Sequence, residues 1–174
     1  MVQAVERVRQ RLLRAAAALE AAGVPYAVAG GNAVAAWVAQ VDPAAVRNTA
    51  DVEILLRRTD LDAAKRALES AGFFHYELSS MHMFMDSPNA SARGAVKVSL
   101  TDHASTFDDA DRAAGYSVLP LEALTEIELT RFKAVNAMNV LDMLQVGLID
   151  ATWISKLPPD LATRLQQLID TPEG

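Results

Sequence analysis

The sequence predicts an α/β (α+β) fold, in which a mixed sheet is flanked by helices and followed by a C-terminal helical extension. Helix-like and strand-like patterns alternate through the first two thirds of the chain, whereas every pattern beyond Pro120 is helical. The chain has 174 residues, of which 51% are hydrophobic, and this suffices for one buried core. We expect a single domain over 1–174, with an α/β core over about 1–119 and the helical extension over about 120–174.

The first part of the chain combines apolar residues at helical spacing with short apolar runs. Val5, Val8 and Leu12 recur on one face of a helix, and Gly23 suits the residue that ends it. The expected elements are a helix over 2–22, a strand over 24–30, a helix over about 32–40, a strand over 50–58 and a helix over 59–72.

Short strand candidates come next, and helices close the chain. The strand candidates are 73–78, 81–86, 95–100 and 115–119, and the helices are expected over 120–134, about 138–146, 151–157 and 158–170. In the strand over 81–86, Met81, Met83 and Met85 share one face because side chains alternate. We expect this methionine face to lie in the core.

The composition excludes several classes of protein. With no cysteine, disulfides, thiolate catalysis and zinc–sulfur sites are excluded. A net charge of -6 argues against an extended nucleic-acid surface, which needs a basic face. No apolar run approaches the roughly 20 residues of a membrane span, and the N-terminus lacks a signal-peptide pattern, so we expect a cytoplasmic protein. The histidines, His75, His82 and His103, lack the spacing of a helical zinc-ligand pair, and no zinc site is expected.

The run "VAGGNAVAAWVAQ" breaks an apolar segment with two glycines and an amide, Gly30, Gly31 and Asn32. Glycine is the usual residue where the backbone must turn sharply between a strand and a helix. An open glycine turn at the start of a helix also lets a phosphate approach backbone N–H groups. The glycines by themselves leave both interpretations open.

About twenty residues later, "RNTADVEILL" carries an acidic pair, Asp51 and Glu53. Positions i and i+2 of a strand point to the same side, so the two carboxylates enter the same space. Their repulsion is costly unless water solvates them or a cation is shared. Oxygen ligands of this kind suit Mg²⁺, which also binds substrate phosphates. The alternative is an exposed strand face with two ordinary acids.

Together, "AGGNAVAAWVAQVDPAAVRNTADVEILL" resembles the nucleotidyltransferase superfamily of polymerase-beta type, in particular small bacterial proteins related to the nucleotidyltransferase toxins of abortive-infection systems. The shared pattern is a Gly-Gly-small turn that opens a helix, followed by Arg-x-Thr-x-Asp-apolar-acid on the next strand. "LEALTEIELTRFKAVNAMNVLDMLQVGLID" is similar to the helical segment of that family. The resemblance covers most of residues 20 to 150 and implies a nucleotidyltransferase-type mixed sheet.

The resemblance also implies a reaction, in which a nucleoside monophosphate is transferred from an NTP and pyrophosphate leaves. Asp51 and Glu53 would hold divalent metal, expected to be Mg²⁺, and a third carboxylate on a later strand would complete the site. The residues assigned to nucleotide binding are Gly30, Gly31, Asn32, Arg47, Thr49 and Lys133.

The chain departs from the family pattern at the third carboxylate. The corresponding strand, "GAVKVSLTDH", carries Lys97, which we include with Asp51 and Glu53 as a catalytic-site candidate. An ammonium there would pair with the two acids and neutralise them without a metal. Asp102 could serve instead only if the strand shifted its register or ended early. Glu128 stands near a position where the family often has Lys, so one basic contact is reversed in sign.

Two classes of function follow from these observations. The first is Mg²⁺-dependent transfer of a nucleoside monophosphate from an NTP to an unknown acceptor. The second is a non-catalytic or repurposed member, either a ligand- or partner-binding module, as in a toxin–antitoxin pair, or a metal-free acid–base catalyst acting on a small molecule. The expected partners are an NTP or another small molecule, with a protein partner under the second interpretation. The transfer reaction is the leading interpretation, and the departures at Lys97 and Glu128 favour the non-catalytic binding module as the alternative.

Overall fold

Five strands form one mixed sheet in the computed structural model, which describes residues 2–102, 107, 110, 112 and 114–172. The strands are β1 (Tyr26–Ala29), β2 (Val52–Arg57), β3 (Phe74–Leu78), β4 (Met81–Met85) and β5 (Val96–Thr101). Their order across the sheet is β1-β2-β5-β4-β3. Only β2 and β5 run parallel, and the other neighbours are antiparallel. The predicted mixed sheet flanked by helices is confirmed.

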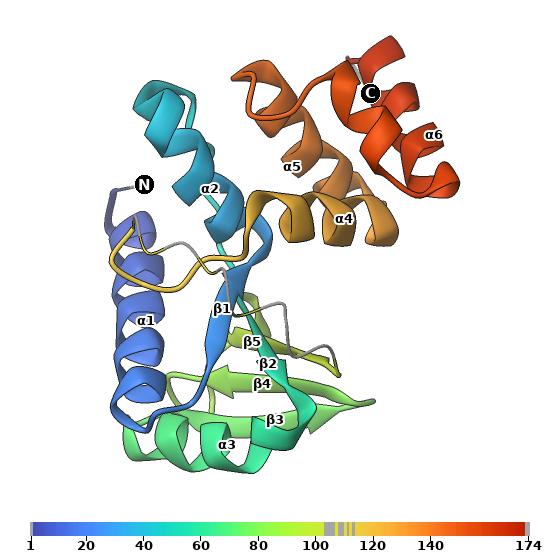
Figure 1. The fold of residues 1–174 in the computed structure, drawn as a ribbon. Helices are drawn as coiled ribbons and strands as arrows, with labels where there is room; N and C mark the ends of the chain where they lie inside the picture. Colours follow the sequence, from blue (N-terminus) through green and yellow to red (C-terminus); the bar gives the residue numbers. More distant parts are fainter. Residues whose placement is uncertain (1, 103–106, 108–109, 111, 113, 173–174) are drawn as a thin grey trace.

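Two helices, α1 (Val2–Ala21) and α3 (Leu61–Ser70), cover one face of this sheet (Figure 1). Alternation places Ile54 and Leu56 of β2 on the covered face, where both are fully buried. Leu19 of α1 and Leu68 of α3 are buried in the same cluster. The apolar stripes of the two helices and one side of the strands thus form the main core.

The remaining helices gather at one end of the sheet. Helix α2 (Gly30–Val41) begins directly where β1 ends, and α4 (Leu121–Arg131) and α5 (Ala134–Gln145) pack against it (Figure 1). Helix α6 (Pro159–Asp170) packs on α4 and α5. Single 3-10 turns are η1 (Pro43–Ala45), η2 (Arg58–Asp60), η3 (Ala92–Gly94) and η5 (Ala151–Lys156). No helix of the described residues is long and apolar enough to cross a membrane.

Three expected elements differ from the structure. The segment expected to form a strand over 115–119 makes one bridge, between Val28 and Val118. Both the backbone N–H and the backbone carbonyl of Val28 form hydrogen bonds with this segment. The helix expected over 151–157 is the 3-10 turn η5. The break between α4 and α5 comes at Phe132, whose left-handed backbone (φ 45°) ends α4 at Arg131. His103 lies outside the described residues, and the expected loop 106–115 lies partly outside them.

The prediction for the methionine face of β4 is confirmed only in part, because Met83 and Met85 are buried but lie outside the main core. Phe84 and its register partner Val96 both belong to the main core, on the side that the helices cover. His82 lies two residues before Phe84 and therefore on the same face of β4. Met83 and Met85 form a small separate cluster with Ala95 on the other face, and Met81 is 49% exposed. Alternation was predicted correctly, but α1 and α3 cover the opposite side.

Candidate functional site

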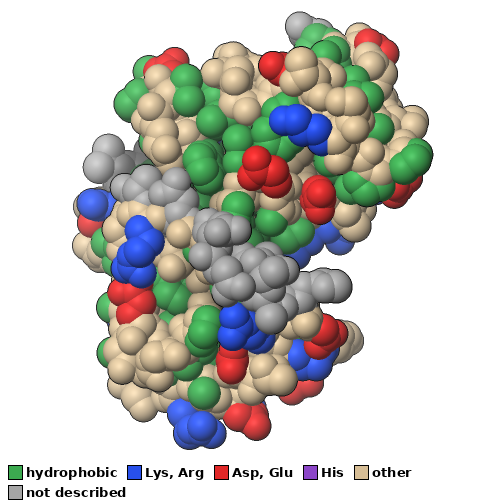
Figure 2. Space-filling model, in the orientation of Figure 1, with side chains coloured by type: hydrophobic (Ala, Val, Ile, Leu, Met, Phe, Trp, Pro, Cys, Tyr) green, Lys and Arg blue, Asp and Glu red, His purple; other side chains and the backbone are tan. Residues whose placement is uncertain are grey.

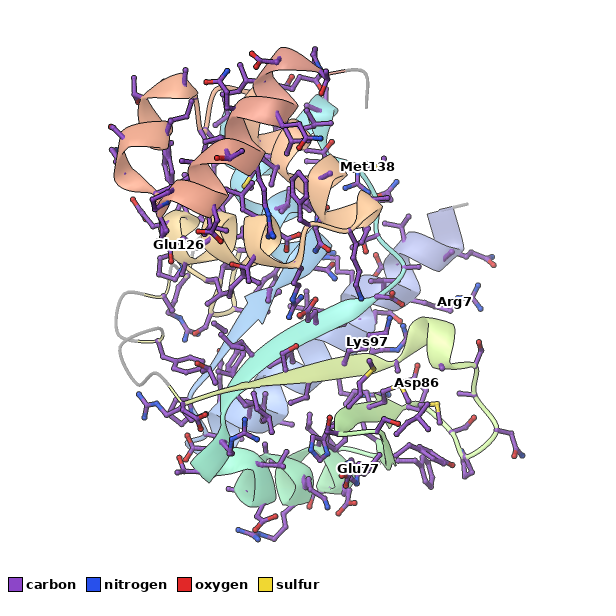
Figure 3. All side chains as sticks on the ribbon, turned by 90° about the vertical axis from the view of Figure 1, so that its right-hand side faces the viewer. Arg7, Glu77, Asp86, Lys97, Glu126 and Met138 are labelled. Atoms are coloured by element: carbon purple, nitrogen blue, oxygen red, sulfur yellow. The ribbon has the colours of Figure 1, made fainter. Side chains whose placement is uncertain are left out.

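The acidic pair lies on the face of the sheet that α1 and α3 leave uncovered. The parallel register aligns Glu53 of β2 with Lys97 of β5. Asp51 immediately precedes β2, and its Oδ2 lies 2.7 Å from the Lys97 Nζ. Figure 3 views the sheet from the side opposite α1 and labels Lys97 on β5. The Lys97 ammonium therefore stands on the neighbouring strand beside the carboxylates. This is the arrangement in which a lysine takes the place of the third carboxylate.

Glu53 has a cation of its own. The Arg131 Nη1 at the end of α4 lies 2.5 Å from its Oε1. The Ser99 hydroxyl donates to the same Oε1 at 3.1 Å and accepts from Arg131 Nη2 at 3.1 Å. The side chains of Glu53 and Arg131 are 20% and 34% exposed, so solvent screens this pair only in part. Each carboxylate of the acidic pair is thus neutralised by one basic side chain.

Arg131 is a site residue that the sequence pattern does not reveal. It stands in a helix far along the chain, and its only sequence signal is a basic residue in the last turn of α4. That position is favourable for a cation near a helix C-terminus, so it suggests no partner outside the helix.

Both glycines have close neighbours, and Gly30 also has a backbone conformation that favours glycine. Gly30 has a left-handed backbone (φ 59°), and a Cβ there would lie 2.8 Å from the Glu53 Oε2. A Cβ on Gly31 would lie 3.0 Å from the Thr49 Cβ. The turn therefore brings the first residues of α2 against the acidic strand. The mechanical interpretation of the glycines is supported, and backbone N–H groups still begin α2 at this point.

Asn32 and Thr49 act on the backbone beside the acids. The Asn32 side-chain amide donates to the Asp51 carbonyl oxygen at 2.6 Å. The Thr49 hydroxyl is 3.5 Å from the same oxygen, at the limit of a hydrogen bond. Both side chains therefore help to position Asp51 at the start of β2.

Arg47 is held by α5. Its Nε lies 2.7 Å from the Asp142 Oδ2, and its Nη2 donates to the Asn139 Oδ1 at 2.6 Å. Both contacts use the guanidinium, so Arg47 connects the segment before β2 to the helical part. Lys133 precedes α5, and its backbone N–H donates to the Asn136 side chain. None of the described contacts joins Lys133 to the acidic pair.

Glu128 continues this network inside the protein. It is fully buried on α4, and its Oε2 accepts from the amides of Asn136 at 2.7 Å and Asn139 at 3.0 Å. Its Oε1 is buried and has no hydrogen-bond partner among the described residues. Burial raises the pKa of the Glu128 carboxyl, and the nearby charge of Glu53 acts in the same direction, whereas the two amides oppose the rise.

Asp102 lies outside the site. Its carboxylate pairs with Arg58 at 3.0 Å beyond the far end of β2, and both side chains are mainly exposed. It directly follows β5, whose last residue is Thr101. The strand therefore does not end early enough to bring Asp102 beside Asp51 and Glu53.

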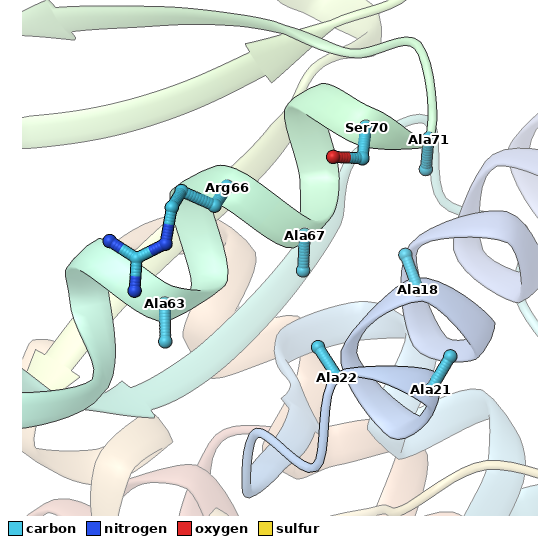
Figure 4. Close-up of a pocket in the computed structure, with 8 residues that line it drawn as sticks. All are labelled: Ala18, Ala21, Ala22, Ala63, Arg66, Ala67, Ser70 and Ala71. Atoms are coloured by element: carbon cyan, nitrogen blue, oxygen red, sulfur yellow. The ribbon is translucent and has the colours of Figure 1, made fainter.

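A groove on the other side of the sheet offers little chemistry by comparison. A groove of about 570 Å³ lies between α1 and α3, lined by alanines with Arg66 and Ser70 (Figure 4). It lies among the helices on the covered side of the sheet and offers one charged group. Among the described side chains on the face shown in Figure 2, basic and acidic groups are scattered and no continuous basic patch is seen.

No protein-family model matches the chain, and no curated protein matches it. Its structure is similar to that of the antibiotic-resistance factor ANT(2'')-Ia, with a TM-score of 0.60 and 12% identity over 98% of this chain and 95% of that one. The chain has a nucleotidyltransferase fold. A second similar structure is an H. pylori protein proposed to be a nucleotidyltransferase, with a TM-score of 0.57 and 15% identity over 99% of this chain and 79% of that one.

Within this nucleotidyltransferase fold, the donor set at the acidic pair does not fit a resident Mg²⁺. The ion takes near-octahedral oxygen ligands at roughly 2.0–2.1 Å. Here Asp51 contacts the Lys97 ammonium, and Glu53 contacts the Arg131 guanidinium. The register partner of Glu53 is again Lys97, which cannot serve as an oxygen ligand. A divalent ion between the acids would lie against two positive charges, so we assign no metal to this pair.

Proposed function

We propose that the chain is a nucleotide-binding protein that uses the nucleotidyltransferase fold without a metal at Asp51 and Glu53. One observation carries the proposal: each of the two carboxylates has its own basic partner, Lys97 or Arg131. The charge of the pair is therefore balanced by side chains of the chain itself. The likeness to nucleotidyltransferases, which is one of fold, supports a nucleotide as the ligand class.

The same side chains give the site its attraction for phosphate. Lys97 and Arg131 stand on one face with the first turn of α2, where backbone N–H groups and the helix dipole favour an anion. A polyphosphate carries more negative charge than a single carboxylate and can compete for both cations. Binding would then exchange internal carboxylate contacts for phosphate contacts.

A second candidate function is Mg²⁺-dependent transfer of a nucleoside monophosphate to an acceptor. The observation that favours it is the position of Glu53 against the Gly30 turn, with Asp51 two residues before it. For this function the two carboxylates would have to exchange Lys97 and Arg131 for the ion. The two candidates therefore differ in whether nucleotide binding needs Mg²⁺.

Isothermal titration calorimetry tests the proposal. ATP, GTP, CTP and UTP are titrated separately into the protein in EDTA and again in excess MgCl₂. We expect binding of at least one nucleotide in EDTA. We also expect at least a tenfold loss of affinity, about 1.4 kcal/mol, in Lys97→Met and in Arg131→Met. Arg58→Met is the matched control, because it removes a guanidinium from an exposed ion pair beyond the far end of β2.

The outcomes of this titration either distinguish the two candidates or reject them. Binding that occurs only with Mg²⁺ and is lost in Asp51→Asn would overturn the metal-free proposal and support the transferase. Pyrophosphate release would then identify the reaction. An absence of binding at millimolar nucleotide, with or without Mg²⁺, would reject both candidates. An equal loss of affinity in Arg58→Met would show that the cations act through general charge and not through contact.

A further inference from the structure

Three side chains with metal-binding atoms meet on the hairpin formed by β3 and β4. Ser79 and Ser80 form its two-residue loop, and both have positive φ, as the tight turns of two-residue hairpins require. This loop sets Glu77 directly opposite His82. His75 is two residues before Glu77 and therefore lies on the same face. The sequence separates the two histidines by seven residues, and the hairpin register brings them together.

The distances suit a single ion. The His75 Nε2 lies 3.1 Å from the His82 Nδ1, and the Glu77 Oε2 lies 3.9 Å from that same Nδ1. One ligand atom from each residue falls within 4.8 Å of the others. Two imidazole nitrogens bound to a tetrahedral Zn²⁺ at roughly 2.0–2.1 Å are about 3.3 Å apart. The imidazole nitrogens already have nearly this separation, and the carboxylate has only a short distance to move.

The surroundings hold the two rings in place and leave one side open. His82 is buried, and its ring stacks on His75 with an interplanar angle of 19°. The His75 ring also packs on Phe84, with centroids 4.9 Å apart. The Glu77 side chain is 57% exposed, so solvent reaches the cluster from its side. Two packed imidazoles and one exposed carboxylate, with room for a water molecule, match the ligand set of an open zinc site.

A simple hydrogen bond between the two rings also accounts for the 3.1 Å separation. In that case one imidazole donates an N–H to the other, and Glu77 has no part in the contact. With a metal, by contrast, the lone pairs of both nitrogens and the carboxylate serve the same ion. The contribution of Glu77 therefore distinguishes the two explanations.

We propose that His75, Glu77 and His82 bind one Zn²⁺ ion, through Nε2, the carboxylate and Nδ1 respectively. Two imidazoles and one carboxylate suit Zn²⁺ and similar transition metals better than Mg²⁺, which prefers oxygen ligands alone. The site is separate from the proposed nucleotide site. His82 pairs with Val98, whereas the adjacent Lys97 points to the opposite face of the sheet. Metal binding would link the edge strand β3 to β4.

Calorimetric titration of ZnCl₂ into the full-length protein without a histidine tag tests this proposal. We expect one ion per chain with micromolar or tighter affinity, unaffected by millimolar Mg²⁺. Zinc should also raise the thermal unfolding temperature of the wild type, since it binds only the folded hairpin. Co²⁺ in place of Zn²⁺ should give the visible absorption of a tetrahedral complex.

Substitutions separate the metal site from the alternative. We expect His75→Gln to abolish binding and Glu77→Gln to weaken it at least tenfold. Glu126→Gln removes an exposed acid from α4, far from the hairpin in Figure 3, and should leave the affinity unchanged. His82→Gln is less informative, because that ring is buried and its removal takes away packing as well as a ligand atom.

Three results would overturn the proposal. One is no zinc binding at 100-fold molar excess over about 10 µM protein, far above the affinity that is usual for such sites. Another is full zinc affinity in His75→Gln, which would place the ion elsewhere. The third is full zinc affinity in Glu77→Gln, which would show that the Glu77 carboxylate is not a ligand of the ion.

Discussion

Replacing Gly30 by Ala tests why this turn carries glycine. Gly30 and Gly23 both have left-handed backbones, with φ of 59° and 65°, so an alanine at either position has a similar conformational penalty. The two positions differ in how much room surrounds a Cβ atom. A Cβ at Gly30 would lie 2.8 Å from the Glu53 Oε2, whereas nothing lies within 4 Å of a Cβ at Gly23. Gly23→Ala is therefore the matched control for the contact with Glu53.

The expected magnitudes follow from these two terms. A left-handed alanine costs about 1–2 kcal/mol, and both variants share this cost. In Gly30→Ala the Glu53 carboxylate must also move, which weakens its half-buried contact with Arg131. With solvent screening included, that loss is about 1–2 kcal/mol. We expect Gly23→Ala to lower the free energy of unfolding by about 1–2 kcal/mol and Gly30→Ala by about 2–4 kcal/mol.

Urea denaturation followed by circular dichroism measures both values. The sharper measurement is a double-mutant cycle, in which Gly30→Ala is repeated in a Glu53→Ala background. There the cost of Gly30→Ala should fall to that of Gly23→Ala, because the crowded carboxylate has been removed. Equal costs for Gly23→Ala and Gly30→Ala in the wild-type background would refute the reasoning. The glycine would then be needed for its backbone conformation alone.

Three further predictions concern charges around the site. Burial raises the pKa of Glu128, so its contribution to stability is present at low pH and is lost as the pH rises above the ordinary value of 4.5. Glu128→Gln should therefore gain stability relative to wild type between pH 4 and pH 8 in urea titrations, and a constant difference would contradict this. Asp142→Asn should lower the free energy of unfolding by about 1 kcal/mol, because its ion pair with Arg47 is partly buried. Asp102→Asn should lower it by less than about 0.5 kcal/mol, because that pair is exposed. Equal values in urea denaturation would contradict the role of burial. Lys97→Asp places an oxygen ligand beside Asp51, so calorimetry should detect Mg²⁺ binding that the wild type lacks. Equal Mg²⁺ binding in both proteins would show that Lys97 does not prevent the ion from binding.

Local sequence determined much of this fold, since strand alternation and glycine turns are properties of neighbouring residues. The i, i+2 spacing placed Asp51 and Glu53 together, and the family resemblance indicated Lys97 as the residue that could stand beside them. The direction of alternation in β4 was equally clear. Which of its faces would meet the core was not, because that depends on where α1 and α3 pack.

The contacts that give the sites their chemistry come from segments distant in the chain. Arg131 reaches Glu53 only because α4 returns to the sheet, and Glu128 acquires its raised pKa only when α5 buries it. His75 and His82 meet because a two-residue loop sets the register of their hairpin. The sequence by itself thus determined the strand that carries the acidic pair and the glycine turn beside it. Only the tertiary structure decided which cations neutralise those acids and which histidines face each other, because long-range packing and register choose the partners of each side chain.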